Sequence, residues 1–177
     1  MKLTSGFAVP YGKCFMCGGD LEVLEKREMG DPMRFQAIRD AVQFELNSFH
    51  FYRMARDRAA NPEQRAVLER LYEAELDHLH ELEEKYHAHL DREVVELSRN
   101  EQALLSNWLF RDIHMGGDAG VRELYQAALE MERRTRDHFR KLAADLPAGL
   151  EKDLCGELAA EEEEHVALLE GELEQIG

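Results

Sequence analysis

Apolar residues recur every three or four positions along four long segments of the chain, with polar residues between them. This spacing places the apolar residues on one face of a helix, which is the pattern of helices that pack against one another. Residues that favour helix, such as Ala, Leu, Glu, Arg and Gln, are frequent in these segments. The predicted helices cover about residues 31–60, 61–90 and 118–145, and a fourth runs from the turn at 147–149 nearly to the end.

Capping residues and turns indicate how these helices connect. Asp31–Pro32 and Asn61–Pro62 each supply a capping side chain followed by proline, which suits the first position of a helix. Almost no loop separates the first two helices, so we expect them to run antiparallel, and Pro147–Ala148–Gly149 joins the last two in the same way. Residues 91–117 are too long a connection for a hairpin. This order predicts an all-α, ferritin-like four-helix bundle with one long crossover between helices 2 and 3.

The first 30 residues have a different composition. They contain Pro10 and several glycines, and they are predicted to be rich in loops, with a short strand or a turn of helix near Leu21–Leu24. We therefore expect a small appended segment over residues 1–30 and a bundle domain over residues 31–177.

One pattern of acidic and histidine residues occurs twice, 87 residues apart, and neighbouring positions such as Tyr52 and Phe139 also match. Each copy has a glutamate and, 30 residues later, the first residue of a Glu-x-x-His pair. Each of these glutamates lies in the middle of an apolar stripe. Arg136, four residues after Glu132, is a polar residue that we would not expect in the stripe around Glu132. A carboxylate and a Glu-x-x-His pair, given twice, is the ligand set of two-metal sites in four-helix bundles. The candidate metal ligands are Glu45, Glu75, His78, Glu132, Glu162 and His165.

Glutamates buried together require compensation of their charge. An ionised carboxylate buried without a partner costs several kcal/mol, so cations or protons must neutralise the group. Two divalent ions would balance the four carboxylates, and oxygen and imidazole ligands suit iron or manganese, although zinc could take their place. Glutamate is abundant in this chain, and isolated matches mean little. The pair Glu84-x-x-His87 has the same spacing but is rotated by about 180° from Glu75, towards solvent.

The composition of the chain argues against several classes of partner. A formal net charge of −15 would repel the phosphates of nucleic acid. We find neither a secretory signal nor an apolar run long enough to span a membrane. Three cysteines, two of them in a Cys-x-x-Cys motif, suit a reducing compartment better than a disulfide framework. We therefore expect a cytoplasmic protein that binds neither nucleic acid nor membrane.

Over residues 32–175 the chain resembles the rubrerythrin branch of the ferritin-like superfamily. The resemblance rests on the six candidate ligands in order, and on Phe51–Tyr52 and His138–Phe139 after the two single glutamates. It implies a non-haem di-iron centre with Glu75 and Glu162 as bridges, the other glutamates as terminal ligands, and one histidine per metal. It also implies chemistry with peroxide or dioxygen, an electron donor that the sequence does not identify, and a homodimer.

Two features depart from the rubrerythrin pattern. Rubrerythrins usually carry an extra glutamate on the third helix, but the positions three before and three after Glu132 are Leu129 and Thr135. Rubrerythrins also usually carry a rubredoxin domain with two Cys-x-x-Cys knuckles, whereas this chain has only Cys14 and Cys17. The single knuckle could share one iron or zinc with the knuckle of a second chain, act as a metal-free redox dithiol, or have no chemical role. Cys155 falls on an apolar stripe and is predicted to be a buried structural residue.

The sequence therefore predicts a di-iron oxidoreductase that reduces peroxide, or O₂, at a carboxylate-bridged two-metal site. Tyr52 and Tyr72 lie on inward stripes, where each could donate a hydrogen bond to a ligand or to a bound oxidant, or simply pack in the core. Ferroxidase activity, oxidation of an organic substrate and a non-catalytic metal-binding interaction module are the alternatives.

Overall fold

The computed structural model describes residues 21–23, 32–59, 61–86, 88–90 and 117–176, together with Ala103, Asn107 and Phe110. Within these residues the chain forms four long helices and two short strands. The helices are α1 (Pro32–Arg58), α2 (Pro62–Tyr86), α5 (Gly117–Asp145) and α6 (Leu150–Ile176). The strands are β1 (Leu21–Val23) and β2 (Ala88–Leu90).

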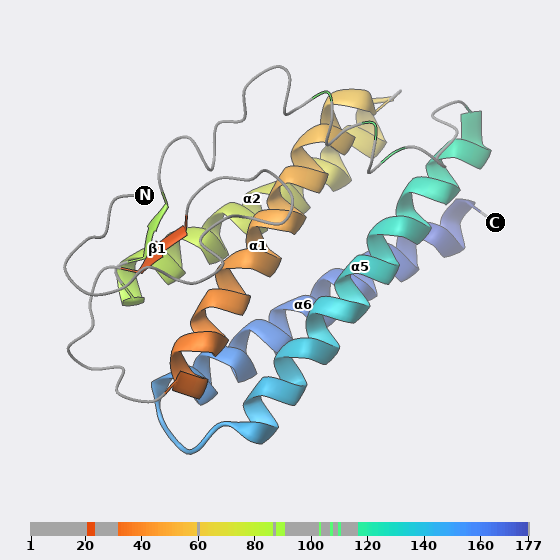
Figure 1. Ribbon diagram of the computed structural model, residues 1–177. Helices are drawn as coiled ribbons and strands as arrows, with labels where there is room; N and C mark the ends of the chain where they lie inside the picture. The colour runs from red at the N-terminus through yellow and green to blue at the C-terminus, as the bar shows by residue number, and fades with distance from the viewer. Residues whose placement is uncertain are drawn as a thin grey trace.

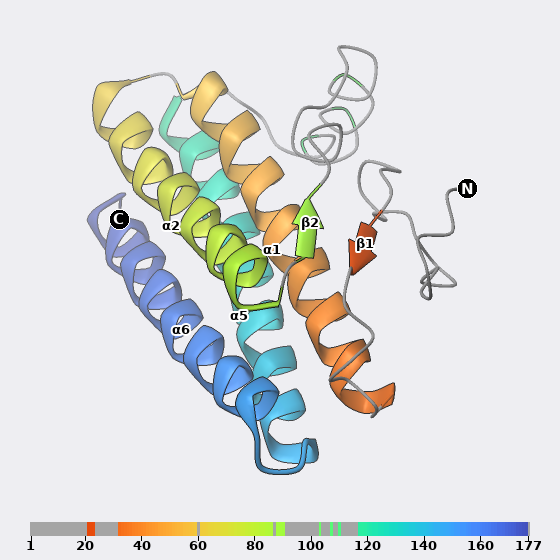
Figure 2. The same cartoon turned by 90° about the vertical axis from the view of Figure 1, so that its left-hand side faces the viewer.

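The four helices form a bundle of two hairpins. Helices α1 and α2 make the first hairpin and α5 and α6 make the second, and the two pairs lie against each other (Figures 1 and 2). The turn between α1 and α2 lies at the same end of the bundle as the start of α5, whereas α2 ends towards the other end (Figure 2). The helix directions therefore agree with a bundle in which one crossover joins the second and third helices.

The predicted helix starts are confirmed where the structure describes them. Helix α1 begins at Pro32. At the start of α2, the Asn61 side chain accepts a hydrogen bond of 2.8 Å from the backbone N–H of Gln64, which is the contact of a helix cap. The turn before α6 uses Gly149, whose φ of +155° favours glycine. A side chain there would also meet the guanidinium group of Arg34, which bonds to the Ala148 carbonyl and ties this turn to the start of α1.

The predicted end of the second helix is wrong. We expected this helix to reach Leu90, but it ends at Tyr86, and Ala88–Leu90 pairs antiparallel with Leu21–Val23. The strand predicted as one possibility near Leu21–Leu24 is thereby confirmed over three residues. A strand obtains its backbone hydrogen bonds from a distant segment, so helical periodicity alone could not reveal where the helix stops.

The core runs along the bundle between all four helices. Its largest fully buried side chains include Ile38, Leu71, Leu79, Phe139 and Leu158. Arg136 does not enter this core: its guanidinium group reaches the surface carboxylates of Glu163 and Asp137. No helix in the described part of the chain is both long and apolar enough to cross a membrane.

Candidate metal centre

All six predicted ligands lie inside the bundle, and every helix contributes at least one of them. The four glutamates are fully buried, with 0% exposure, and the two histidines are only 6% and 8% exposed. Glutamate is rarely buried to this degree without a partner, so these positions require a chemical explanation. Glu45 lies on α1, Glu75 and His78 on α2, Glu132 on α5, and Glu162 and His165 on α6.

The hairpins bring these residues to the same level of the bundle. Glu45 and Glu75 are equally far along the chain from position 60, where α1 turns into α2. Glu132 and Glu162 are likewise equally far from Pro147, in the turn between α5 and α6. Two antiparallel helices place such residues side by side, so each hairpin delivers its own pair of carboxylates to the core.

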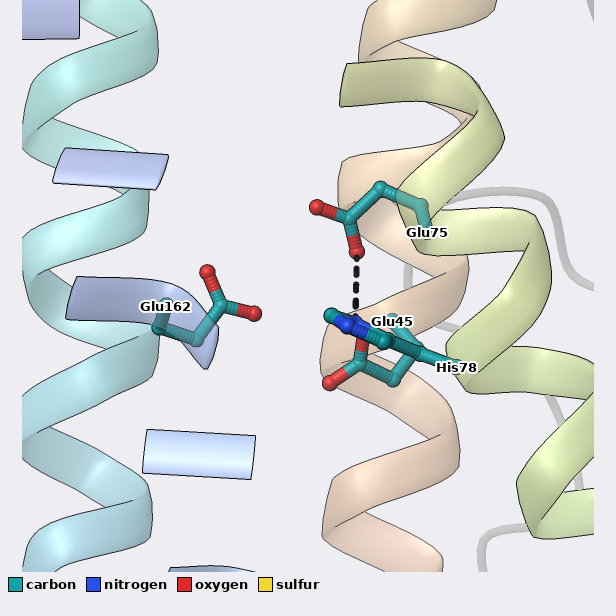
Figure 3. A group of neighbouring side chains, drawn as sticks. All are labelled: Glu45, Glu75, His78 and Glu162. Atoms are coloured by element: carbon teal, nitrogen blue, oxygen red, sulfur yellow. Dashed lines mark hydrogen bonds and ion pairs between the residues drawn. The ribbon is translucent and has the colours of Figure 1, made fainter. Parts of the chain in front are cut away.

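The six side chains form two groups that share two members. In each group every residue offers one ligand atom, and these atoms all lie within 4.8 Å of one another. Figure 3 shows the members of the first group pointing towards one another from α1, α2 and α6. Glu75 and Glu162 belong to both groups, so each could contact two ions. The first group is Glu45, Glu75, His78 and Glu162, and the second is Glu75, Glu132, Glu162 and His165.

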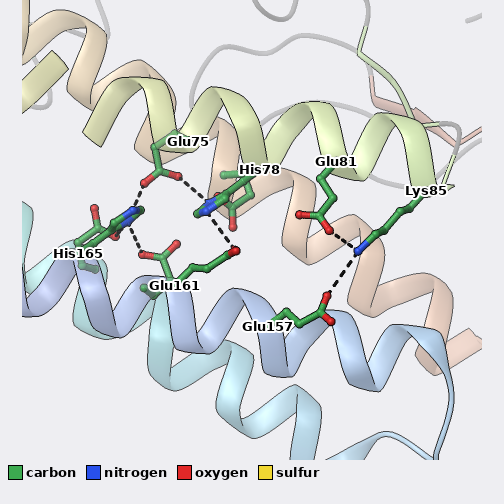
Figure 4. A network of polar contacts seen from close by, with 10 residues as sticks. Glu75, His78, Glu81, Lys85, Glu157, Glu161 and His165 are labelled. Atoms are coloured by element: carbon green, nitrogen blue, oxygen red, sulfur yellow. Dashed lines mark hydrogen bonds and ion pairs between the residues drawn. The ribbon is translucent and has the colours of Figure 1, made fainter. Parts of the chain in front are cut away.

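Both histidines present the same ring nitrogen to the carboxylates. His78 Nδ1 lies 2.9 Å from Glu45 Oε2 and 3.6 Å from Glu75 Oε2. His165 Nδ1 lies 3.3 Å from Glu75 Oε1 and 3.3 Å from Glu162 Oε2. Glu75 therefore sits between the two imidazoles (Figure 4), whose rings stack with their centroids 5.5 Å apart. The Nδ1 atoms are the ones placed to bind a metal.

Burial strongly affects the acidity of three of the glutamates. Burial raises the pKa of Glu45 to about 8, and the nearby Glu75 carboxylate adds to the effect. Burial also raises the pKa of Glu132 well above its usual range, with repulsion from Glu162 as the next cause. The pKa of Glu162 is raised in the same way, by burial and then by Glu75. Without cations, these groups favour their protonated, neutral forms.

For Glu75 and the two histidines, neighbouring charged groups outweigh burial, so the pKa of each shifts in the direction that favours the charged form. Burial alone would raise the pKa of Glu75, but the imidazoles of His165 and His78 outweigh it and hold the pKa at about 2. Burial would lower the pKa of His78, but the carboxylates of Glu161 and Glu45 raise it far above its usual range. For His165, Glu75 likewise outweighs burial and raises the pKa. In the metal-free protein, protons on the imidazoles thus partly compensate the buried negative charge.

The unsatisfied atoms of the cluster fit a cation site. Five of the eight carboxylate oxygens of these glutamates make no hydrogen bond among the described residues, and of these five the two of Glu75 lie nearest an imidazole nitrogen, at 3.3 and 3.6 Å. Buried polar atoms normally find a partner, so a group of them facing one another is unusual. Carboxylate oxygens and imidazole nitrogens are ligands that iron, manganese and zinc accept. The buried Glu and His side chains could therefore hold a metal ion.

Only one of the two candidate tyrosines reaches the cluster. Tyr52 is fully buried, and its hydroxyl donates a hydrogen bond to Glu132 Oε1. The ring of Tyr72 instead packs near Phe49, at 5.1 Å, and beneath the guanidinium group of Arg56, at 4.5 Å. No contact between Tyr72 and the six ligands is seen in the described residues, so packing is its observed role.

The sequence reasoning missed one residue beside the cluster. Glu161 Oε2 lies 3.2 Å from His78 Nε2, on the side of the ring away from the other carboxylates (Figure 4). The internal repeat argued against a role for Glu161, because the matching position is Ala74, which carries no ligand atom. The contact joins α6 to α2, and no spacing along the chain would indicate it.

Other predicted positions have simpler outcomes. Cys155 is buried in a small apolar cluster with Ala37 and Leu146, as expected for a structural cysteine. Thr135 Oγ1 bonds to the backbone of its own helix, so it is not placed as an extra ligand. Glu84 is exposed, as expected. Cys14, Cys17 and His87 lie outside the described residues.

The fold and the cluster define a four-helix protein with a buried group of carboxylates and imidazoles able to hold metal. The chain matches no protein-family model, no curated protein and no solved structure. The resemblance to rubrerythrins therefore stays a prediction that rests on the sequence motifs.

Proposed function

We propose that this protein binds two metal ions inside its bundle and acts as a di-iron oxidoreductase that reduces peroxide or O₂. The observation that supports it best is the pair of overlapping ligand groups, which share Glu75 and Glu162. A single divalent ion would leave two of the four carboxylate charges to be balanced by protons. One ion would take Glu45 and His78, the other would take Glu132 and His165, and Glu75 and Glu162 would bridge them.

The charges of the site support two divalent ions. Four carboxylates and two neutral imidazoles carry four negative charges, which two divalent cations balance. Cations would replace the protons that the metal-free cluster holds, because a ligating carboxylate or imidazole must be deprotonated at the atom that binds. Iron and manganese suit this set of oxygen and nitrogen ligands, and zinc could bind in their place.

When bound, two ferrous ions would supply the two electrons that, with two protons, convert hydrogen peroxide into two molecules of water. The surrounding residues would limit the access of bulk water, because the carboxylates are fully buried and the histidines nearly so. Tyr52 would hold Glu132 in place through its hydroxyl and keep a proton at the edge of the site. The electron donor, the homodimer and a metal shared through Cys14 and Cys17 are further predictions that belong to this hypothesis.

Anaerobic loading with Fe(II), followed by separate mixing with peroxide and with O₂, tests the proposal. We expect two irons per chain and an absorbance change that is rapid with peroxide and slow with O₂. The variant Glu162→Gln should lose bound iron, whereas Glu164→Gln should not, because Glu164 is exposed. Rapid oxidation by O₂ with release of ferric iron would instead indicate a ferroxidase. Two bound irons that react with neither oxidant would indicate a metal-binding module.

A further inference from the structure

The two halves of the cluster are not equivalent. The offset of 87 residues that relates His78 to His165 also relates Ala74 to Glu161. Glu161 reaches His78 from α6, with its Oε2 atom 3.2 Å from Nε2. The methyl side chain of Ala74 has no polar atom, so it cannot make the corresponding contact with Nε2 of His165. In the part of the chain that the structure describes, His165 meets the carboxylates of Glu75, Glu132 and Glu162 through Nδ1.

The position of Glu161 suits a role behind a metal ligand. The Nδ1 atom of His78 faces Glu45, so its Nε2 atom points away from the centre of the cluster and towards Glu161 (Figure 4). The Glu161 side chain is 45% exposed, and its Oε2 atom is buried at ion-pair distance from Nε2, where it makes no aligned hydrogen bond. A carboxylate at this place favours the tautomer with the proton on Nε2 and leaves Nδ1 free to bind a metal.

A second difference between the halves also favours metal binding by Glu45 and His78 over binding by Glu132 and His165. Tyr52 donates a hydrogen bond to Glu132, whereas its counterpart in the repeat is Phe139, which has no hydroxyl to offer Glu45. A hydrogen bond to a carboxylate stabilises its charge and makes it a weaker base. The half with Glu45 and His78 therefore has an imidazole that is a better metal ligand. The half with Glu132 and His165 has a carboxylate that is a weaker metal ligand.

We propose that Glu161 is a positioning residue that makes the two metal positions unequal, so that the position formed by Glu45 and His78 fills first and binds more tightly. This inference rests on the proposed function, since it assumes that the cluster holds two ions. Carboxylates that orient a ligating histidine typically change metal affinity by about 10- to 100-fold. We expect a difference of this size between the two binding steps.

Anaerobic titration of the metal-free protein with Co(II), followed by calorimetry and by visible absorption, tests the inference. The wild type should bind two ions in two resolved steps. Glu161→Ala should weaken the first step by about 10- to 100-fold and leave the second unchanged. Glu161→Gln should weaken the first step less than Glu161→Ala does, because its amide oxygen can accept a hydrogen bond from Nε2–H without carrying a charge. Glu164→Gln, an exposed neighbour on the same helix, should match the wild type.

The absorption spectrum separates positioning from general structural damage. Glu161→Ala should change the bands that appear with the first equivalent of Co(II), while its helical content and the melting temperature of its metal-free form stay those of the wild type. Two bound ions with the same constants in Glu161→Ala and wild type would overturn this inference and leave the proposed function standing. A wild type that binds fewer than two ions would overturn both.

Discussion

The metal-free protein should become more stable as the pH falls from 8 to 5, and Glu45 should account for a definite share of the gain. In the folded protein, burial and the neighbouring Glu75 raise the pKa of Glu45 from 4.5 to about 8. The folded state therefore holds this proton more tightly than the unfolded chain does. Its contribution to stability is fully present below about pH 4.5 and is lost as the pH rises through about 8.

The size of this contribution follows from the two pKa values. A difference of one pKa unit corresponds to about 1.4 kcal/mol, so the shift of Glu45 from 4.5 to about 8 has an upper limit of about 5 kcal/mol. Glu75 acts in the opposite sense, because its pKa is lowered to about 2. Its contribution is present above about pH 4.5 and is lost only as the pH falls towards 2, so it does not mask the effect of Glu45 between pH 5 and 8.

Urea unfolding of chelator-treated protein at several values between pH 5 and 8 measures the effect. Glu45→Gln removes the titrating group, so its free energy of unfolding should depend less on pH, by up to about 1.4 kcal/mol per pH unit. Glu164→Gln is the matched control, because it removes an exposed glutamate from a chain of net charge −15 without touching the core. If Glu45→Gln and Glu164→Gln had the same pH dependence, the account of the buried proton would be wrong.

The stabilisation that bound metal provides should depend on pH in the opposite direction to the stability of the metal-free protein. Ions bind to deprotonated carboxylates and imidazoles, so protons compete with them more strongly as the pH falls. The increase in melting temperature that Fe(II) or Co(II) produces should therefore be largest near pH 8 and shrink towards pH 5. A stabilisation by metal that grows at low pH would contradict binding at this cluster.

Three further substitutions give distinct expected results. Glu75→Gln should reduce metal content more than Glu45→Gln in elemental analysis, because Glu75 belongs to both ligand groups and Glu45 to one. Tyr52→Phe should lower the free energy of unfolding of the metal-free protein by about 1–3 kcal/mol in urea, because Glu132 Oε1 loses its buried hydrogen-bond donor. Asn61→Ala should lower it by about 1 kcal/mol in the same assay, because α2 loses its capping side chain.

Each of these results has a control. Tyr72→Phe removes a hydroxyl that does not reach the cluster, so it should cost less stability than Tyr52→Phe. Equal metal loss in the Glu75 and Glu45 variants would contradict the sharing of Glu75. An Asn61→Ser variant should keep most of the stability of the wild type, since serine also caps helices well.

Much of the bundle and of the cluster could be predicted because the relevant information is local and repeated. A spacing of three or four residues reports which side of a helix faces the core, and proline after Asn61 marks where the second helix starts. The duplicated pattern then selects Glu162 from a run of four glutamates, where spacing from a single copy would be weak. The short hairpin turns explain why the selected residues meet at one level.

Other features depended on contacts between segments that are far apart in the sequence. The second helix stops before Leu90 because Ala88–Leu90 finds a strand partner at Leu21–Val23. Tyr52 and Tyr72 looked equivalent as inward aromatics, but only the first meets a ligand of the opposite hairpin. Glu161 matches Ala74 in the repeat, which carries no ligand atom, and its contact with His78 crosses from one hairpin to the other.

The sequence by itself therefore determined which residues face inwards and which carboxylates and imidazoles could share one pocket, because these depend on rotation about a helix axis and on the distance to a turn. Only the tertiary structure decided which atoms meet across the two hairpins, including the ring nitrogen that each histidine presents and the carboxylate behind His78. Those contacts depend on the tilt and relative rotation of neighbouring helices, which the packing of their side chains sets.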